Sequence, residues 1–500
     1  MRSTASGMLN RCINLLLPFV IRTVIIHRLG TEFLGLNSLF TSVIQVLNLA
    51  ELGMGNALIF SMYKPVAEDD YATLHALLRL YKRIYRIIGF VILGIGICLI
   101  PLLPILVDTK QLVGTNIDIH ILYLIYLFNT VVSYLFFAYR KSLLMAYQRQ
   151  DVISNLNSVF HFLLYTLQIG VLVIKPNYYA YIILMPLFTT AENLAAAIIS
   201  KRWYKQILTT PPRAGVEAGN IQHGVKYIVG HKIGAVVIQS ADSIVISSFL
   251  NLAILTIYGN YHYVITALIG IINVGYNAIL AGVGNSILLQ TKAKLYDLFQ
   301  ELNFLLFLVI AFCTSCLLAL YQPFMQLWMG SDYLLPMRTV ILLAVYFYTW
   351  QIRVIGLNFK DAAGMWKDDW LKPYVGLILN ITLNIILVQT LGLDGVLLAT
   401  IAVMVVVYHP WEMIVLHRKL FQCSFRNYLC CMLEYGCKTV LCAAGASFLV
   451  SRITLGGLTG FFVKVAVAAV FSLVALFLLC WRKKEMKQLL NRGQQIWRQM

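Results

Sequence analysis

Apolar runs of about twenty residues recur along nearly the whole chain, and they constrain its fold more than any other feature. Each run is long enough to cross a hydrocarbon core of about 30 Å as one helix. The runs are continuous in Leu, Ile, Val and Ala, whereas the strands of a membrane barrel alternate between apolar and polar residues. Only 12% of the 500 residues are charged, roughly half the fraction of an average soluble chain. The sequence therefore predicts an all-α integral membrane protein.

The apolar runs divide the chain into about fourteen predicted transmembrane helices. They lie at 10–27, 34–61, 84–106, 119–139, 152–174, 179–200, 226–248, 252–280, 303–327, 335–357, 371–390, 394–416, 428–451 and 458–481.

The distribution of the 39 Lys and Arg residues predicts how these helices cross the bilayer. Most of these residues lie in alternate loops and at the two ends, and such loops normally face the cytoplasm. We therefore expect both termini to be cytoplasmic, and we attribute the net charge of +18 to membrane orientation rather than to a nucleic-acid partner. The basic inner surface would also attract anionic membrane lipids. The predicted outer loops hold only Arg28, Lys110, Lys175, Arg338 and Arg452.

Two parts of the chain resemble each other at a nearly constant spacing. The segment Lys141–Asp151 matches Lys360–Trp370, which starts 219 positions later, and Glu192 matches Glu412 at a spacing of 220. Six helices separate each helix from its counterpart, and because six is even, both repeats enter the membrane in the same direction. We therefore expect two pseudo-symmetric parallel six-helix bundles with the substrate site between them, a transporter arrangement.

The repeat predicts the following domains: a six-helix bundle at 1–200, a cytoplasmic linker at 201–225, a second six-helix bundle at 226–418, helices 13 and 14 at 419–481, and a basic cytoplasmic tail at 482–500.

The first helix carries a polar stripe. Arg11, Asn14, Pro18 and Arg22 are spaced so that they share one helix face. A charge at membrane depth costs at least about 2.5 kcal/mol, so it normally faces a wet cavity or a partner. Two arginines on one face favour a binding site for an anion such as phosphate, and Pro18 is a candidate hinge. Alternatively, Arg11 and Arg22 extend to opposite membrane surfaces.

Further polar residues lie within the predicted spans. Lys232, Gln239 and Asp242 occupy one broad side of the helix at 226–248. Lys232 is a candidate for the same anion site. Asp242, with Gln239 beside it, either binds a coupling cation or proton or neutralises a cation on a neighbouring helix.

Three glutamates, Glu51, Glu192 and Glu412, are candidates for a gate that closes the inner side. Alternatively, each pairs with a Lys or Arg of an inner loop. No nucleotide-binding loop, catalytic motif or metal-ligand spacing is evident, so we expect neither enzymatic activity nor a cofactor or metal.

Six segments carry a likeness to a known family: Leu34–Phe40, Leu49–Ala57, His231–Ala235, Asp242–Ile246, Phe359–Gly364 and Lys372-Pro373. In these segments the sequence resembles bacterial polysaccharide flippases of the Wzx type, which belong to the multidrug/oligosaccharidyl-lipid/polysaccharide exporter superfamily. The likeness extends over about residues 8–420.

This resemblance implies an exporter of the bacterial inner membrane that flips an undecaprenyl-pyrophosphate-linked oligosaccharide between leaflets by alternating access. Its product would feed capsule, O-antigen or a similar surface polysaccharide, and other polysaccharide assembly proteins are candidate partners. Arg11, Arg22 and Lys232 would receive the pyrophosphate, and the last two helices would hold the lipid tail. A multidrug/cation antiporter of the same superfamily, a membrane glycan polymerase and a non-transporting scaffold are the alternatives.

Overall fold

The computed structural model describes residues 2–51, 54–107, 117–213, 225–489 and 491, and all regular structure in them is helical. Parts of the predicted outer loop at 108–118, the linker at 201–225 and the tail at 482–500 lie outside the described residues. The α-helices are α1 (Arg2–Arg28), α2 (Thr31–Leu47), α3 (Met54–Ala67), α4 (Tyr71–Leu99), α5 (Leu103–Leu106), α6 (Ile119–Leu135), α7 (Lys141–Ala146), α8 (Gln150–Ile174), α9 (Tyr178–Trp203), α10 (Lys205–Thr209), α11 (Val225–Phe249), α12 (Leu252–Leu289), α13 (Lys292–Met329), α14 (Met337–Gln351), α15 (Val354–Ala362), α16 (Lys372–Leu391), α17 (Leu393–Val403), α18 (His409–Val415), α19 (Phe425–Ser451) and α20 (Gly457–Cys480).

Short segments of other helix types join these elements. The 3₁₀ segments include η1 (Asn48–Ala50) and η4 (Ala138–Arg140), and the π-helical segments η7 (Met404–Tyr408) and η8 (Leu416–Phe421) flank α18.

The described helices confirm the multi-pass α-helical fold. Thirteen of them are long and apolar enough to cross a membrane, and a bent pair, Ile119–Leu135 with Ala138–Ala146, raises the number to fourteen if it forms one crossing. The pair is bent by 43°. Phe137, between its two helices, has a φ of 61°, a left-handed conformation that interrupts a right-handed helix.

Several helices extend beyond their predicted spans, such as α4, which begins at Tyr71, and α13, which begins at Lys292. One predicted span is not a single helix. The span predicted at 34–61 is two separate helices, since α2 ends at Leu47 and α3 begins at Met54. Near this break the backbone of Gly55 approaches α4 so closely that an added Cβ would lie 2.8 Å from the Tyr81 hydroxyl and 2.9 Å from that of Tyr85. The chain ends one helix and starts another where these contacts form.

The described chain divides into two compact units, Met1–Thr256 (unit 1) and Ile257–Met500 (unit 2). In unit 1, α1 packs on α8, α8 and α6 pack on α9, and α2 packs on α11. The division predicted from the repeat places the helix at 226–248 with the second half, whereas α11 packs within unit 1. The repeat-based domain division stays a prediction.

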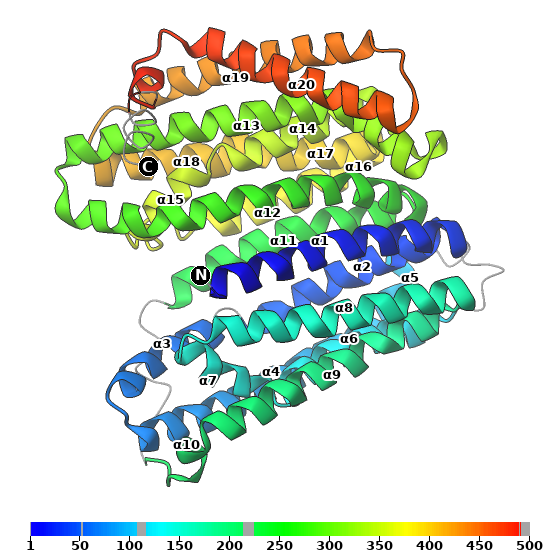
Figure 1. The fold of residues 1–500 in the computed structure, drawn as a ribbon, viewed down its shortest axis with the longest axis vertical. Helices are drawn as coiled ribbons and strands as arrows, with labels where there is room; N and C mark the ends of the chain where they lie inside the picture. Colours follow the sequence, from blue (N-terminus) through cyan, green and yellow to red (C-terminus); the bar gives the residue numbers. More distant parts are fainter. Residues whose placement is uncertain (1, 52–53, 108–116, 214–224, 490, 492–500) are drawn as a thin grey trace. The chain divides into compact units, whose positions relative to one another are not determined.

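Helix α13 is the central element of unit 2, because it packs against α14, α19 and α20. The last two helices lie side by side along it (Figure 1), and Tyr435 of α19 stacks on Phe307 of α13 with their ring centroids 4.0 Å apart. With 38 residues, α13 is about 57 Å long, nearly twice the thickness of a hydrocarbon core of about 30 Å.

Candidate functional site

Unit 1 contains a polar pocket between the end of α2 and α11. Its volume is about 490 Å³. Three of the predicted site residues line it together, although they come from different parts of the sequence: Glu51 from the α2 side, and Lys232 and Gln239 from α11. The side-chain amides of Gln45 and Asn48 complete its polar lining. The pocket therefore combines one ammonium group with three amide groups that can donate and accept hydrogen bonds.

Hydrogen bonds hold the carboxylate of Glu51 on the wall of this pocket. One oxygen accepts from the Tyr85 hydroxyl at 2.5 Å, and the other accepts from the Tyr134 hydroxyl at 3.2 Å. Tyr81 donates in turn to the Tyr85 hydroxyl at 2.9 Å. Glu51 is thus bonded to tyrosines of α4 and α6, and its gate role stays a prediction.

The predicted stripe on α1 contacts α8 and α9 within unit 1. Asn14 Oδ1 lies 2.6 Å from His161 Nδ1 and accepts from the Tyr165 hydroxyl at 3.3 Å. Arg22 interacts electrostatically with Tyr181 of α9, and Arg11 is exposed. Helix α1 runs through Pro18 without interruption. Asn14 and Arg22 of this stripe therefore face neighbouring helices of unit 1, whereas Arg11 is exposed. Lys232 lies instead on the pocket between α2 and α11.

The contacts of Asn14 continue to a predicted gate residue. Glu192 accepts from Lys141 Nζ at 2.6 Å, and His161 Nε2 lies 3.7 Å from its other oxygen. Glu192 is 8% exposed. A polar chain therefore runs from α1 through α8 to α9 and α7, and it pairs Glu192 with a cation of a predicted inner loop. The remaining candidate of unit 1, Asp242 on α11, is 2% exposed, and its ion-coupling role stays a prediction.

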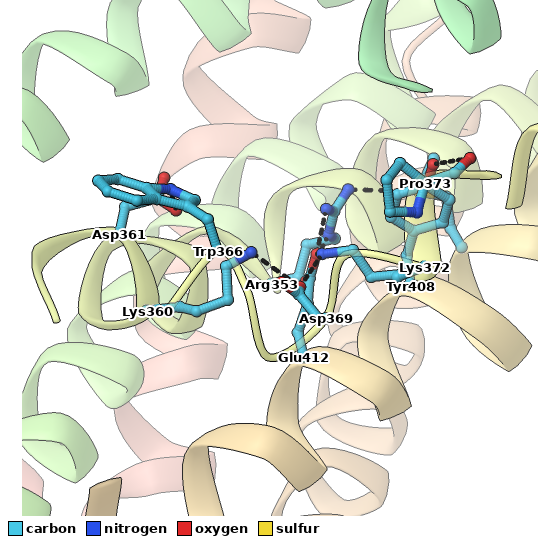
Figure 2. A network of polar contacts seen from close by, with 10 residues as sticks. Arg353, Lys360, Asp361, Trp366, Asp369, Lys372, Pro373, Tyr408 and Glu412 are labelled. Atoms are coloured by element: carbon cyan, nitrogen blue, oxygen red, sulfur yellow. Dashed lines mark hydrogen bonds and ion pairs between the residues drawn. The ribbon is translucent and has the colours of Figure 1, made fainter. Parts of the chain in front are cut away.

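Unit 2 contains a buried ionic network, which Figure 2 shows from close by. Arg353 forms two hydrogen bonds to Glu412, from Nη2 at 2.6 Å and from Nε at 3.0 Å. Lys372 Nζ bridges Glu412 at 2.7 Å and Asp369 at 2.6 Å. Lys360 Nζ reaches the same oxygen of Asp369 at 2.8 Å. Three cations and two carboxylates thus join the ends of α14, α15, α16 and α18.

The burial of this network explains its geometry. The side chains of Lys360 and Lys372 are 1% exposed, and Glu412 is fully buried. A buried charge is stable only where close opposite charges and hydrogen bonds offset the cost of removing it from water. The aromatic ring of Tyr408 adds to this, since it lies 5.0 Å from the Arg353 guanidinium. These ion pairs link α14, α15, α16 and α18 at the predicted inner end of unit 2.

Sequence reasoning found only part of this network. Glu412 is a predicted gate residue, and Lys360 and Lys372 lie in the family-like segments, but the sequence predicts neither Arg353 nor Asp369 as a partner. No sequence signal points to Arg353 or Asp369, and the repeat indicates only that a lysine lies beside each glutamate. Glu192 and Glu412 each accept from a lysine, Lys141 and Lys372, although Lys360, the sequence counterpart of Lys141, binds Asp369 instead.

Within the described residues, no group of three or more His, Cys, Asp and Glu side chains could hold a metal ion.

The fold is similar to solved structures of membrane transport proteins. The lipid II flippase MurJ in an inward closed conformation aligns over 96% of this chain and 98% of its own, with a TM-score of 0.62 and 13% identity. An inward-facing multidrug resistance MATE family transporter of the MOP superfamily aligns over 83% of this chain and 97% of its own, with a TM-score of 0.57 and 13% identity. An outward-facing one aligns over 83% and 94%, with a TM-score of 0.53 and 13% identity. No protein-family model matches the chain, and no curated protein sequence matches it. The chain therefore has the fold shared by this flippase and by these transporters of the MOP superfamily.

Proposed function

We propose that this protein flips a polyprenyl-pyrophosphate-linked oligosaccharide across the bacterial inner membrane by alternating access. The oligosaccharide would be a repeat unit of a surface polysaccharide. The chain would act as a transporter rather than as an enzyme, and the proteins that polymerise the exported unit would be its partners.

The observation that carries this proposal is the polar pocket of unit 1. Lys232 supplies a cation that can pair with a phosphate as a point charge, while Gln45, Asn48 and Gln239 supply amide donors and acceptors suited to sugar hydroxyls. Glu51 is the acidic residue of the lining, and two tyrosine hydroxyls already bind its carboxylate. This lining suits an anionic, hydroxyl-rich headgroup better than a cationic drug.

The extent of the fold likeness gives further support. The lipid II flippase aligns over 96% of this chain, whereas the two multidrug transporters align over 83%. The difference is about 65 residues of this chain. A flippase of a lipid-linked substrate must accommodate a long lipid tail, and helices beyond the twelfth offer additional surface for it.

The first test measures flipping by protein reconstituted into vesicles that contain a fluorescent undecaprenyl-pyrophosphate-linked oligosaccharide. A charge-assisted hydrogen bond contributes about 1.5–3 kcal/mol, so Lys232→Ala should lower the flipping rate about tenfold or more. Lys232→Arg keeps the cation and should retain most of the rate.

Lys175→Ala is the matched control, because Lys175 is an exposed cation of the same unit outside the pocket. Equal rates for Lys232→Ala and Lys175→Ala would remove Lys232 from the binding site. Proton-coupled uptake of cationic dyes, with no flipping of the lipid-linked oligosaccharide, would instead identify a multidrug antiporter.

A further inference from the structure

Unit 2 carries a second pocket, which opens on the surface of its α17–α18 span. Its volume is about 420 Å³. Its lining residues recur four positions apart, so they form one stripe along the span. The stripe includes Val406, Pro410, Trp411, Ile414, Arg418 and Lys419.

The local backbone explains why the surface is hollowed here. Helix α18 lies between two π-helical segments, η7 and η8, and π-helical turns are rare features that occur frequently at functional sites. Pro410 stands in the first turn of α18, where its ring supplies no backbone N–H. The regular side-chain spacing of an α-helix is therefore interrupted at both ends of the stripe.

The length of the stripe corresponds to one leaflet. Val406 and Arg418 are twelve residues apart, which is about 18 Å along a helix, whereas half of a hydrocarbon core is about 15 Å. Val406 lies at the apolar end of the stripe, and it is 71% exposed. Both cations lie at the other end, where the charge distribution of the chain predicts the cytoplasmic surface.

The two cations of the stripe have different surroundings. Lys419 forms an ion pair with Asp368, so its charge is already partly compensated. Arg418 is exposed, and it forms no ion pair with any residue that the structure describes. A planar guanidinium in this position can bind a phosphate group through two parallel hydrogen bonds.

We propose that this groove, defined by Val406, Pro410, Trp411, Ile414, Arg418 and Lys419, binds an anionic phospholipid of the inner leaflet. Arg418 binds the headgroup phosphate, and one acyl chain lies along the apolar stripe toward Val406. Basic pockets on the cytoplasmic side of membrane helices are suited to such headgroups. This lipid is a resident ligand of unit 2 and is distinct from the transported substrate.

Quenching of Trp411 fluorescence tests this assignment, because Trp411 lines the groove. The full-length protein is reconstituted into vesicles that mix phosphatidylcholine with increasing brominated phosphatidylglycerol, and the Trp411 signal is the difference from a Trp411→Phe variant. A second series of vesicles contains brominated phosphatidylcholine in place of brominated phosphatidylglycerol. Trp411 fluorescence should be quenched at a lower fraction of brominated lipid in the phosphatidylglycerol series than in the phosphatidylcholine series.

Arg418→Gln should reduce this preference about fivefold, because a cation near an anionic surface contributes about 1 kcal/mol. Arg418→Lys should keep most of it. Arg426→Gln is the matched control, since Arg426 is an exposed cation near the start of α19 and outside the groove.

Three results would overturn the proposal. The first is an unchanged preference in Arg418→Gln, and the second is an equal loss in Arg426→Gln. The third is stronger displacement of the brominated lipid by undecaprenyl phosphate than by phosphatidylglycerol, which would assign the groove to a polyprenyl lipid. None of these readouts depends on transport, so the flippase proposal and this one can fail separately.

Discussion

Glu412 binds two cations of the buried ionic network in unit 2, as Asp369 does. It binds both Arg353 and Lys372, and no part of it reaches solvent. A buried cation that loses its carboxylate keeps the cost of its desolvation without the compensating attraction. The stability of the predicted inner end of unit 2 therefore depends strongly on this side chain.

Glu412→Gln should lower the free energy of unfolding by about 3–5 kcal/mol, because it leaves buried cations with too little negative charge. Thermal unfolding of the purified protein in detergent measures this effect. Asp332→Asn, at an exposed carboxylate of the same unit, should change the stability little.

A double variant tests whether the charges of the network are coupled. Lys372→Met removes one of the two cations bound to Glu412, so Glu412→Gln combined with Lys372→Met should be more stable than the sum of the two single effects implies. Strict additivity of the two changes would show that the network does not act as one electrostatic unit.

The sequence could predict some residue contacts and not others. Glu192 and Glu412 lie near the ends of apolar runs that adjoin basic loops, so pairing with a cation follows from local spacing. The burial of Lys360 and Lys372 does not follow from it, because a lysine in a loop appears solvated until the folded chain covers it. The polar pocket of unit 1 could not be predicted from local spacing either, because Glu51 and Lys232 line it together only when α2 packs on α11.

Helix α3 begins against α4 without space for a side chain at Gly55. An added Cβ would lie within 2.9 Å of the Tyr81 and Tyr85 hydroxyls and of the Glu51 carboxylate. Gly55→Ala should therefore lower the free energy of unfolding by about 1–3 kcal/mol, the usual cost of overpacking. Thermal unfolding in detergent measures the change.

Gly94→Ala is the control for helix propensity. Gly94 is a helical glycine of α4 with no atom within 4 Å of its added Cβ. This variant should be neutral or should raise the stability by up to about 1 kcal/mol, since alanine favours helix over glycine. If both variants destabilise the protein equally, the close contact at Gly55 does not matter.

Hydropathy predicted the helices well because a continuous apolar run is itself the physical requirement for crossing a bilayer. It failed at the breaks. No hydropathy minimum predicted that α2 ends at Leu47, where a 3₁₀ turn follows at Asn48–Ala50, or that Phe137 adopts a left-handed conformation after α6. These interruptions depend on contacts with other helices and on single backbone angles, and neither is encoded in average hydropathy.

At the scale of the whole molecule, the bent pair α6–α7 decides the number of crossings. Thirteen crossings would place the two ends of the chain on opposite sides of the membrane, and fourteen would place them on the same side. The bias of Lys and Arg predicts that both lie in the cytoplasm, so the bent pair should form one complete crossing.

Epitope tags test this arrangement. One tag precedes Arg2 and a second follows Lys487, and neither should bind antibody in intact spheroplasts, while both should do so after permeabilisation. A tag inserted after Ser331, which lies in a predicted outer loop, should be accessible without permeabilisation. Exposure of only one of the two terminal tags would mean an odd number of crossings and would contradict the parallel repeat.

Helix α13 continues beyond the thickness of the bilayer core, and this gives it a mechanical property that shorter spans lack. The proline within α13, Pro323, lies in its last two turns. When a helix of about 57 Å tilts within a layer of about 30 Å, its far end moves roughly twice as far as that of a helix confined to the layer. Because α14, α19 and α20 all pack on α13, a small rotation in the membrane would become a larger displacement at the membrane surface. The long helix can thus act as a lever for the elements attached to it.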